Sequence, residues 1–163
     1  MASEPMVEME IPELHDFLEQ EFPQVSDEVR IEALSVEAIT MRLKVGEQHL
    51  RPGGTMGGPA MFLLADVAAY CIILSRIGWR PLVVTTNAGI DFLRKPAADR
   101  DLLCVAGILK MGRALVVVEA KLFSEGQEQP VARANLTYSI PPEDRPQEVL
   151  IYLHKQGTEN AGN

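Results

Sequence analysis

Apolar and polar side chains alternate with a period of two within the segment Val36–Gly46. The apolar positions are Ile39, Met41, Leu43 and Val45, and the polar positions between them are Thr40, Arg42 and Lys44. A period of two predicts a strand that buries one face and exposes the other. The preceding segment, Val29–Leu34, is expected to pair with this strand or to lead into it.

A helical period appears nearer the N-terminus, over Ile11–Glu21. Leu14, Phe17 and Leu18 follow one another at the spacing of a single helix face. Pro23 lies just past the last periodic residue, where proline commonly follows a helix. A short amphipathic helix is therefore predicted over this segment.

The segment Pro59–Ile77, which contains the longest apolar run, Pro59–Ser75, predicts one long helix. Proline is favoured at the first helical position, Gly58 can serve as the cap before it, and Gly78 follows the run as glycine often follows a helix. The run is apolar on nearly all sides, which is typical of a helix enclosed by other structure. Because it is short for a bilayer and contains Asp66, we expect a buried helix and no membrane span.

The chain after this helix is rich in Val, Ile, Leu and Thr and predicts further strands. Four are expected, over Pro81–Leu93, Asp101–Met111, Ala114–Ser124 and Pro130–Ile140. Short separators divide them, at 96–100, 111–113 and 125–127, so neighbouring strands are expected to pair as antiparallel hairpins. A C-terminal helix is predicted around Pro146–Lys155.

Together these elements predict an α+β protein. One antiparallel sheet would wrap around one long apolar central helix, which is the hotdog fold. A single domain is expected over residues 11–156, with flexible tails at 1–10 and 157–163. One such protomer leaves apolar surface beside its helix, so a homodimer or a homotetramer is expected.

Composition narrows the classes of function. The formal net charge of -8 argues against a nucleic-acid-binding protein, which normally carries a basic face. Cys71 and Cys104 lie in apolar runs without the paired spacing of a zinc site, and we interpret them as buried thiols of a reducing compartment. No basic-then-apolar signal opens the chain, so a cytoplasmic location is expected. The three histidines are isolated, and no metal is expected.

Asp66 stands out as the only charged side chain between Arg51 and Arg76. Burying an unpaired carboxylate is costly, and it normally requires a strong partner or a changed protonation state. Two interpretations stay open. Asp66 can be a structural residue satisfied by hydroxyl or backbone groups in a subunit interface, or a catalytic base or nucleophile in a cleft.

The glycine-rich loop before the helix supplies a second chemical group. Free N–H groups at a helix start can polarise a carbonyl or hold an oxyanion. Pro59 has no N–H, so Gly58 is the best single donor. Gly58 and Asp66 are eight residues apart, which is ~12 Å along a helix. Both can reach one reacting carbon only from two facing helices, which predicts an active site shared by two subunits.

Two segments, Arg51–Tyr70 and Val84–Pro96, resemble the PaaI-like hotdog thioesterases. The last three predicted strands are also similar to that family, so that the resemblance covers about Val36–Pro141. It implies the hotdog fold and hydrolysis of acyl-CoA thioesters to a free acid and CoA, with no metal or redox cofactor.

The resemblance also implies roles for particular residues. Many members carry a His-Gly-Gly loop with an acid nine positions after the His. Here Asp66 matches the acid, Gly57 stands at the His, and Gly58 matches the glycine whose N–H polarises the thioester carbonyl. A frequent Asn falls at Arg51, so both the usual His and the usual Asn are missing.

Further residues are expected to position water or substrate. A hydroxyl residue that helps to hold the water falls near Thr85, with Asn87 beside it. The phosphates of CoA require local cations on an acidic chain. The candidates, besides Arg51, are Arg94, Lys95, Lys110 and Arg113. The alternative is that these cations are solvated turn residues, and Arg51 can instead pair with Asp66 across the interface.

Two other functions remain open. The missing His and Asn suit a non-catalytic hotdog protein that binds acyl-CoA or only dimerises. A hotdog dehydratase is the second rival, but its chemistry usually needs a His–Asp pair, and the predicted helix contains no His. An acyl carrier protein thioester is a less favoured substrate than acyl-CoA. His49 adjoins the glycine-rich loop and is a further candidate for the lining of the site.

Overall fold

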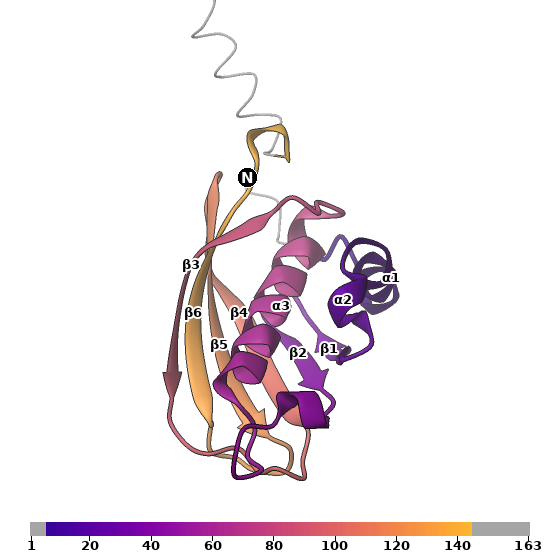
Figure 1. Ribbon diagram of the computed structural model, residues 1–163. Coiled ribbons are helices and arrows are strands. Elements are labelled where there is room, and N and C mark those ends of the chain that lie inside the picture. Colours follow the sequence, from indigo (N-terminus) through magenta and orange to yellow (C-terminus); the bar gives the residue numbers. More distant parts are fainter. Residues whose placement is uncertain (1–5, 145–163) are drawn as a thin grey trace, which may run out of the picture.

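A computed structural model describes residues 6–144. Six antiparallel strands form one sheet that wraps around a single long helix (Figure 1). In chain order the elements are α1 (Ile11–Glu21), α2 (Pro23–Ser26), β1 (Val29–Leu34), β2 (Ile39–Leu43), α3 (Gly58–Ile77), β3 (Val84–Phe92), β4 (Leu102–Met111), β5 (Leu115–Ser124) and β6 (Ala132–Ser139), with short 3₁₀ turns at Glu47–His49 and Pro142–Asp144. The predicted hotdog fold is confirmed.

The strands and helices predicted within the described residues are all present. The clearest period-two segment forms a strand shorter than predicted, because only Ile39–Leu43 pairs with neighbours. Pro23 does more than follow the first helix, since it is the first residue of α2. The C-terminal helix predicted around Pro146–Lys155 lies outside the described residues.

The start of α3 differs by one residue from the prediction. Gly58 is the first helical residue, Gly57 is the cap with an extended backbone, and Pro59 is at the second helical position. The N–H groups of the first helical turn have no acceptor within the helix. Proline at the second position therefore loses no helical hydrogen bond. Gly78 ends the helix with a φ of 87°, a conformation that favours glycine.

The position of α3 explains its composition. By length and composition, α3 is the one helix of the described residues that could cross a membrane. Most of its residues are buried within this protein, as in the core helix of a globular domain. Leu64, Ile72 and Leu74 are fully buried in this core. A helix buried between a curved sheet and its covering elements must be apolar on nearly every side.

The pairing of the strands corrects one prediction. The hairpins β4–β5 and β5–β6 form as expected, but β3 does not pair with β4. The sheet order is β1-β2-β4-β5-β6-β3, so β3 pairs with β6 and the chain then crosses to place β4 beside β2. The amides of Leu93 and Arg94 still bond to Val131 beyond the end of β3, which leaves no tight hairpin turn toward β4. Separator composition predicts a turn but does not decide which strand lies beside which.

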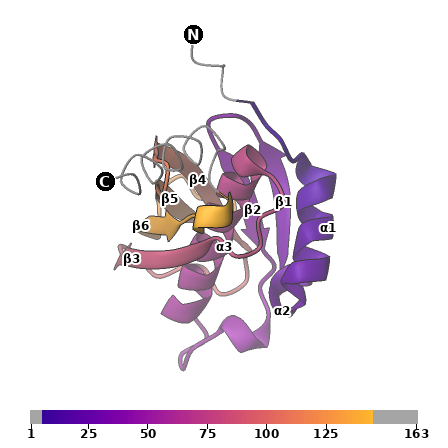
Figure 2. The same ribbon diagram turned by 90° about the horizontal axis from the view of Figure 1, so that it is seen from above.

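The N-terminal helices cover the edge of the sheet formed by β1, which is opposite the edge formed by β3. Figure 2 shows α1 and α2 beside β1. Leu14, Phe17 and Leu18 are buried as their spacing predicted. Within the predicted N-terminal tail, the amides of Glu8 and Met9 both bond to the carbonyl of Ser75, at 2.7 and 3.3 Å. This part of the tail is therefore attached to the last turn of α3.

The other edge of the sheet, formed by β3, is not covered by any described element. β3 is an edge strand, and most of its residues are exposed. Val84, Phe92 and Leu93, on β3 or just after it, are exposed large apolar side chains. An uncovered edge strand with apolar side chains is a template for pairing with another chain. The single protomer thus leaves apolar surface beside its helix.

Candidate active site

Asp66 lies on the third turn of α3, half-buried, with its carboxylate directed at β3 and β6. The hydroxyls of Thr85 and Tyr138 both donate hydrogen bonds to Asp66 Oδ1, at 2.7 and 2.6 Å. Within the described residues no cation pairs with this carboxylate. The acid is therefore held by neutral donors on one oxygen.

Strand register brings the two hydroxyls together. Thr85 and Tyr138 are direct partners in the antiparallel β3–β6 ladder, so their side chains project from the same face of the sheet. The register then shifts before Asn87, which leaves Thr86 as the extra residue of a bulge. The Thr86 hydroxyl donates to the carbonyl of Thr137. The bulge lies next to the carboxylate and changes the direction of the rest of β3.

Asp66 opens into a small pocket of about 260 Å³. Thr85 and Tyr138 line it with the carboxylate. Its other walls are Glu21, Phe22, Tyr70, Pro81, Val83 and Val84. The carboxylate is therefore accessible from a pocket in this protomer and is not enclosed in the core.

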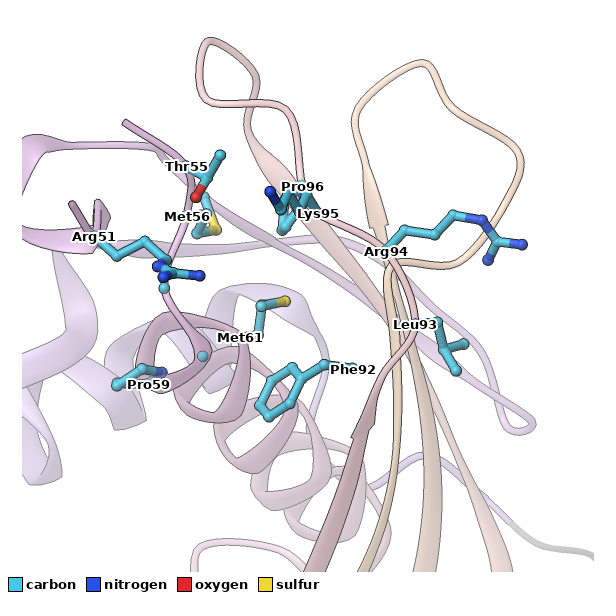
Figure 3. A pocket seen from close by; sticks show the side chains of 12 residues that line it. Arg51, Thr55, Met56, Pro59, Met61, Phe92, Leu93, Arg94, Lys95 and Pro96 are labelled. Carbon is cyan, nitrogen blue, oxygen red and sulfur yellow. The ribbon is translucent and has the colours of Figure 1, made fainter. Parts of the chain in front are cut away.

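A second and larger cleft of about 580 Å³ lies at the N-terminus of α3 (Figure 3). It is formed by the glycine-rich loop and by the chain after β3. Its lining is Arg51, Thr55, Met56, Gly57, Gly58, Pro59, Met61, Phe92, Leu93, Arg94, Lys95 and Pro96. Of the predicted cations, Arg51 and Lys95 lie at this opening. Arg94 also lines it, but its side chain extends away from the cleft, and its guanidinium donates a hydrogen bond to the carbonyl of Pro130 at 2.8 Å (Figure 3).

Gly58 lies in this larger cleft under the ring of Phe92. Its N–H belongs to the first turn of α3, where amides have no acceptor within the helix. A Cβ atom at this position would lie 3.1 Å from Phe92 Cζ, which is tighter than most Cβ contacts, so the ring would have to shift slightly. The absence of a side chain thus allows the aromatic ring to pack against the start of the helix.

The carboxylate and the predicted carbonyl-polarising amide open into different cavities. Asp66 lines the smaller pocket and Gly58 the larger cleft. Two turns of α3 separate them, about 12 Å at the helical rise per residue. One protomer thus holds the two groups too far apart for one reacting carbon, and the expectation of a site shared between subunits stays a prediction.

The other predicted binding residues lie elsewhere. Asn87 is exposed on β3 and lines neither the pocket of Asp66 nor the cleft of Gly58. Lys110 and Arg113 flank the β4–β5 turn. This turn lies near the start of β3, whereas Arg94 and Lys95 follow the end of β3, so the two groups are at opposite ends of the strands. In this protomer the predicted cations therefore form two separate groups.

His49 supports the glycine-rich loop from inside. It is buried, its Nδ1 accepts from the amide of Gly46 at 3.0 Å, and its carbonyl accepts from the amide of Gly57 at 2.8 Å. Its Nε2 is 3.4 Å from a carboxylate oxygen of Glu28. His49 does not line the cleft of Gly58, but it anchors the residue that caps α3.

Sequence reasoning missed Tyr138 as a residue of the site. The alternation of apolar and polar residues along β6 indicates only that Tyr138 is buried. No sequence pattern connects it with Asp66, which lies 72 residues earlier. Burial, and then the nearby charge of Asp66, raise the pKa of Tyr138 well above its ordinary value. The phenol therefore stays protonated and acts as a hydrogen-bond donor.

Comparison with known proteins relates this geometry to a family. Residues 53–131 match the thioesterase superfamily. The fold superposes on a candidate thioesterase from Silicibacter sp. TM1040 with a TM-score of 0.79 and 53% identity, over 85% of this chain and 96% of that one. A comparison with curated proteins gives no match.

Two more distant structures share the fold. A variant of the phenylacetic acid degradation protein PaaI from Thermus thermophilus is 22% identical with a TM-score of 0.64, over 73% of this chain and 99% of that one. A hypothetical thioesterase from Streptococcus pneumoniae TIGR4, crystallised with coenzyme A, is 20% identical with a TM-score of 0.67, over 78% and 96%.

Proposed function

Because the chain belongs to the thioesterase superfamily, we propose that it hydrolyses acyl-CoA thioesters to a free acid and CoA, with Asp66 as the catalytic carboxylate. The observation that carries this proposal is the accessible carboxylate of Asp66, which two hydroxyls orient within an otherwise apolar helix. Placing a carboxylate among apolar side chains costs free energy, and catalysis is the function that explains its presence here.

The chemistry needs a carboxylate and a polarised carbonyl. Asp66 either accepts a proton from the attacking water or attacks the thioester carbon itself, forming an anhydride that water then cleaves. In both routes the C–S bond breaks and the CoA thiolate takes up a proton. The N–H of Gly58 from a second copy polarises the carbonyl, and one such donor stabilises the transition state by roughly 3–4 kcal/mol.

A second copy of the chain completes the proposed site. β3 offers an open edge of nine residues for pairing across a two-fold axis. On α3, Phe62 is 37% exposed and lies one turn before Asp66 on the same face. Pairing through β3 would cover this face and bring the helix start of one copy toward the carboxylate of the other. We propose a homodimer, or a homotetramer of two such dimers.

The proposed place for CoA is the cleft beside Gly58. The whole chain has a formal charge of -8, so a polyphosphate ligand requires a local cluster of cations. Arg51 and Lys95 supply positive charge there, whereas the guanidinium of Arg94 is directed away and binds the carbonyl of Pro130. The crystallised complex of the Streptococcus pneumoniae relative with coenzyme A supports CoA as part of the substrate. No metal or redox cofactor enters the proposal.

We place the protein in the cytoplasm. Its two cysteines, Cys71 and Cys104, are free and buried, which fits a reducing compartment.

Release of free thiol from a panel of acyl-CoA substrates tests the proposal. We expect turnover by the native protein and a loss of about 10²- to 10⁴-fold in Asp66→Asn, because that change removes the base or nucleophile and keeps the shape. Binding of a non-hydrolysable acyl-CoA analogue, measured by calorimetry, should survive the substitution.

A matched control is Asp16→Asn. Asp16 is an exposed aspartate of α1, at the edge of the sheet away from β3, and it lines neither cavity, so its removal should leave turnover unchanged. Equal activity of the native protein and Asp66→Asn would refute the catalytic role of Asp66.

The non-catalytic acyl-CoA-binding module remains the second candidate. Two residues favour it. Position 57 is Gly and position 51 is Arg, where the PaaI-like hotdog thioesterases commonly have His and Asn. Tight binding of acyl-CoA by the native protein, with no thiol release from any CoA or acyl carrier protein thioester, would favour this module over the enzyme.

A further inference from the structure

The two oxygens of the Asp66 carboxylate have different surroundings. Oδ1 accepts both hydroxyl hydrogen bonds, from Thr85 and from Tyr138. In the described part of the chain no side chain or backbone amide bonds to Oδ2. A carboxylate oxygen accepts about two hydrogen bonds through its lone pairs, so Oδ1 is occupied and Oδ2 is left for chemistry.

Tyr138 binds both the side chain and the backbone of the same residue. Its hydroxyl oxygen is 2.6 Å from Asp66 Oδ1 and 2.7 Å from the main-chain carbonyl oxygen of Asp66. The single phenolic hydrogen is shared between these two acceptors, and the contacts hold the carboxylate against its own helix turn and restrict its rotation. Thr85 approaches the same Oδ1 from the paired position on β3.

The phenol ring is itself held in place. Tyr138 is 2% exposed and stacks on Tyr70, with ring centroids 6.1 Å apart and an interplanar angle of 13°. Burial and the nearby charge of Asp66 raise the pKa of Tyr138, so the phenol keeps its proton at neutral pH. A rigid, protonated donor is suited to orienting a carboxylate and unsuited to accepting a proton.

We propose that Tyr138 is a positioning residue of the thioesterase site, which together with Thr85 holds Asp66 Oδ1 and so makes Oδ2 the oxygen that reacts. This inference rests on the proposed function and adds to it the identity of the reacting atom. As a base, Oδ2 takes the proton of the water whose oxygen forms the new C–O bond. As a nucleophile, Oδ2 itself forms that bond while the C–S bond breaks.

Tyr138→Phe tests the proposal, because it removes only the hydroxyl from a buried ring. Misorientation of the reacting oxygen affects the chemical step and not substrate binding, so kcat should fall about 10- to 100-fold with KM nearly unchanged. Ser75→Ala is the control. Its buried hydroxyl, also on α3, donates only to the carbonyl of Ile72, and its loss should leave kcat unchanged.

Thr85 provides an independent variant in case Tyr138→Phe fails to fold. Thr85→Val removes the second hydroxyl at constant shape and should lower kcat, whereas Thr85→Ser keeps the hydroxyl and should restore most of it. If Thr85 only packed against its neighbours, kcat would depend on its methyl group. Thr85→Val would then keep full activity, and Thr85→Ser would lose it. Circular dichroism and the unfolding midpoint establish that each variant is folded.

The outcomes separate this inference from the proposed function. Loss of turnover in Asp66→Asn with full kcat in both Tyr138→Phe and Thr85→Val would overturn the positioning role and leave the thioesterase intact. Absence of thiol release from every substrate in the native protein would overturn both. A fall in kcat at constant KM in the folded variants supports the inference.

Discussion

At the scale of single residues, the chemistry depends on how a carboxylate is kept inside an apolar helix. Asp66 receives two hydroxyl donors on one oxygen and, within the described residues, no cation, so its charge is oriented without being neutralised. A salt bridge would have engaged the oxygens that the reaction needs. The sequence marks Asp66 as exceptional among its neighbours, but its partners come from strands that the sequence does not relate to it.

The amide of Gly58 can be tested at the same scale by two substitutions. Gly58→Ala and Gly58→Pro both add a Cβ atom under the Phe92 ring, but only proline removes the N–H. Proline is well tolerated at a first helical position, and the extended backbone of Gly57 suits a residue before proline.

If this N–H polarises the thioester carbonyl, Gly58→Pro should lower kcat about 10²- to 10³-fold relative to Gly58→Ala. The comparison cancels the steric effect on Phe92, which moves in both variants. Steady-state thiol release measures it. Equal activity of the two variants would exclude the amide of Gly58 from the reaction.

At the scale of elements, β3 has two functions. Its inner residue Thr85 contacts the carboxylate, while its outer edge carries no partner strand within the described chain. The bulge at Thr86 separates these two parts, since it shifts the register before Asn87. A strand with a bulge beside a candidate site is a common way to redirect a side chain.

The edge of β3 leads to a prediction about assembly. Ala88→Lys places a charge in the middle of the exposed edge, and two such lysines would face each other across a two-fold axis. We expect dimerisation to weaken by about 2 kcal/mol or more, roughly thirtyfold in the dissociation constant.

Sedimentation velocity over a range of protein concentrations measures this effect. Thiol release should fall together with the dimer fraction, because the proposed site takes one group from each copy. The control is Gln24→Lys, which adds the same charge on α2 at the other end of the sheet. A fully active monomer of Ala88→Lys would contradict the shared site.

At the scale of the whole molecule, the free energy of unfolding should depend on pH through two buried thiols. Burial raises the pKa of Cys71 and Cys104 from 9.0 to about 12. The unfolded chain releases these protons above pH 9, whereas the folded chain keeps them until about pH 12. The stability contributed by the protonated thiols is therefore complete below pH 9 and is lost as the pH rises.

Between pH 9 and pH 10 each thiol should lower the free energy of unfolding by about 1 kcal/mol. Denaturant unfolding at pH 8, 9 and 10 under reducing conditions measures the effect. The double variant of Cys71→Ala and Cys104→Ala should lose this part of the slope and keep a smaller part, roughly 0.4 kcal/mol each from Tyr70 and Tyr138, whose pKa values burial also raises. An unchanged slope in the double variant would contradict the assignment.

The local pattern of the sequence determined the elements, the buried helix, the exceptional acid and the glycine-rich start of α3. Each of these depends on side chains within a few turns of one another, where periodicity records which face is buried. Even there the cap lies at Gly57 and not at Gly58, because helix ends depend on backbone geometry that composition does not encode.

Only the tertiary structure decided that β3 lies beside β6, that Tyr138 reaches Asp66, and that Arg51 and Lys95 share one cleft. The physical reason is that backbone hydrogen bonds are the same for any pair of strands. Which strands pair is selected by how the whole sheet closes around α3, and residues far apart in the chain come together only through that closure.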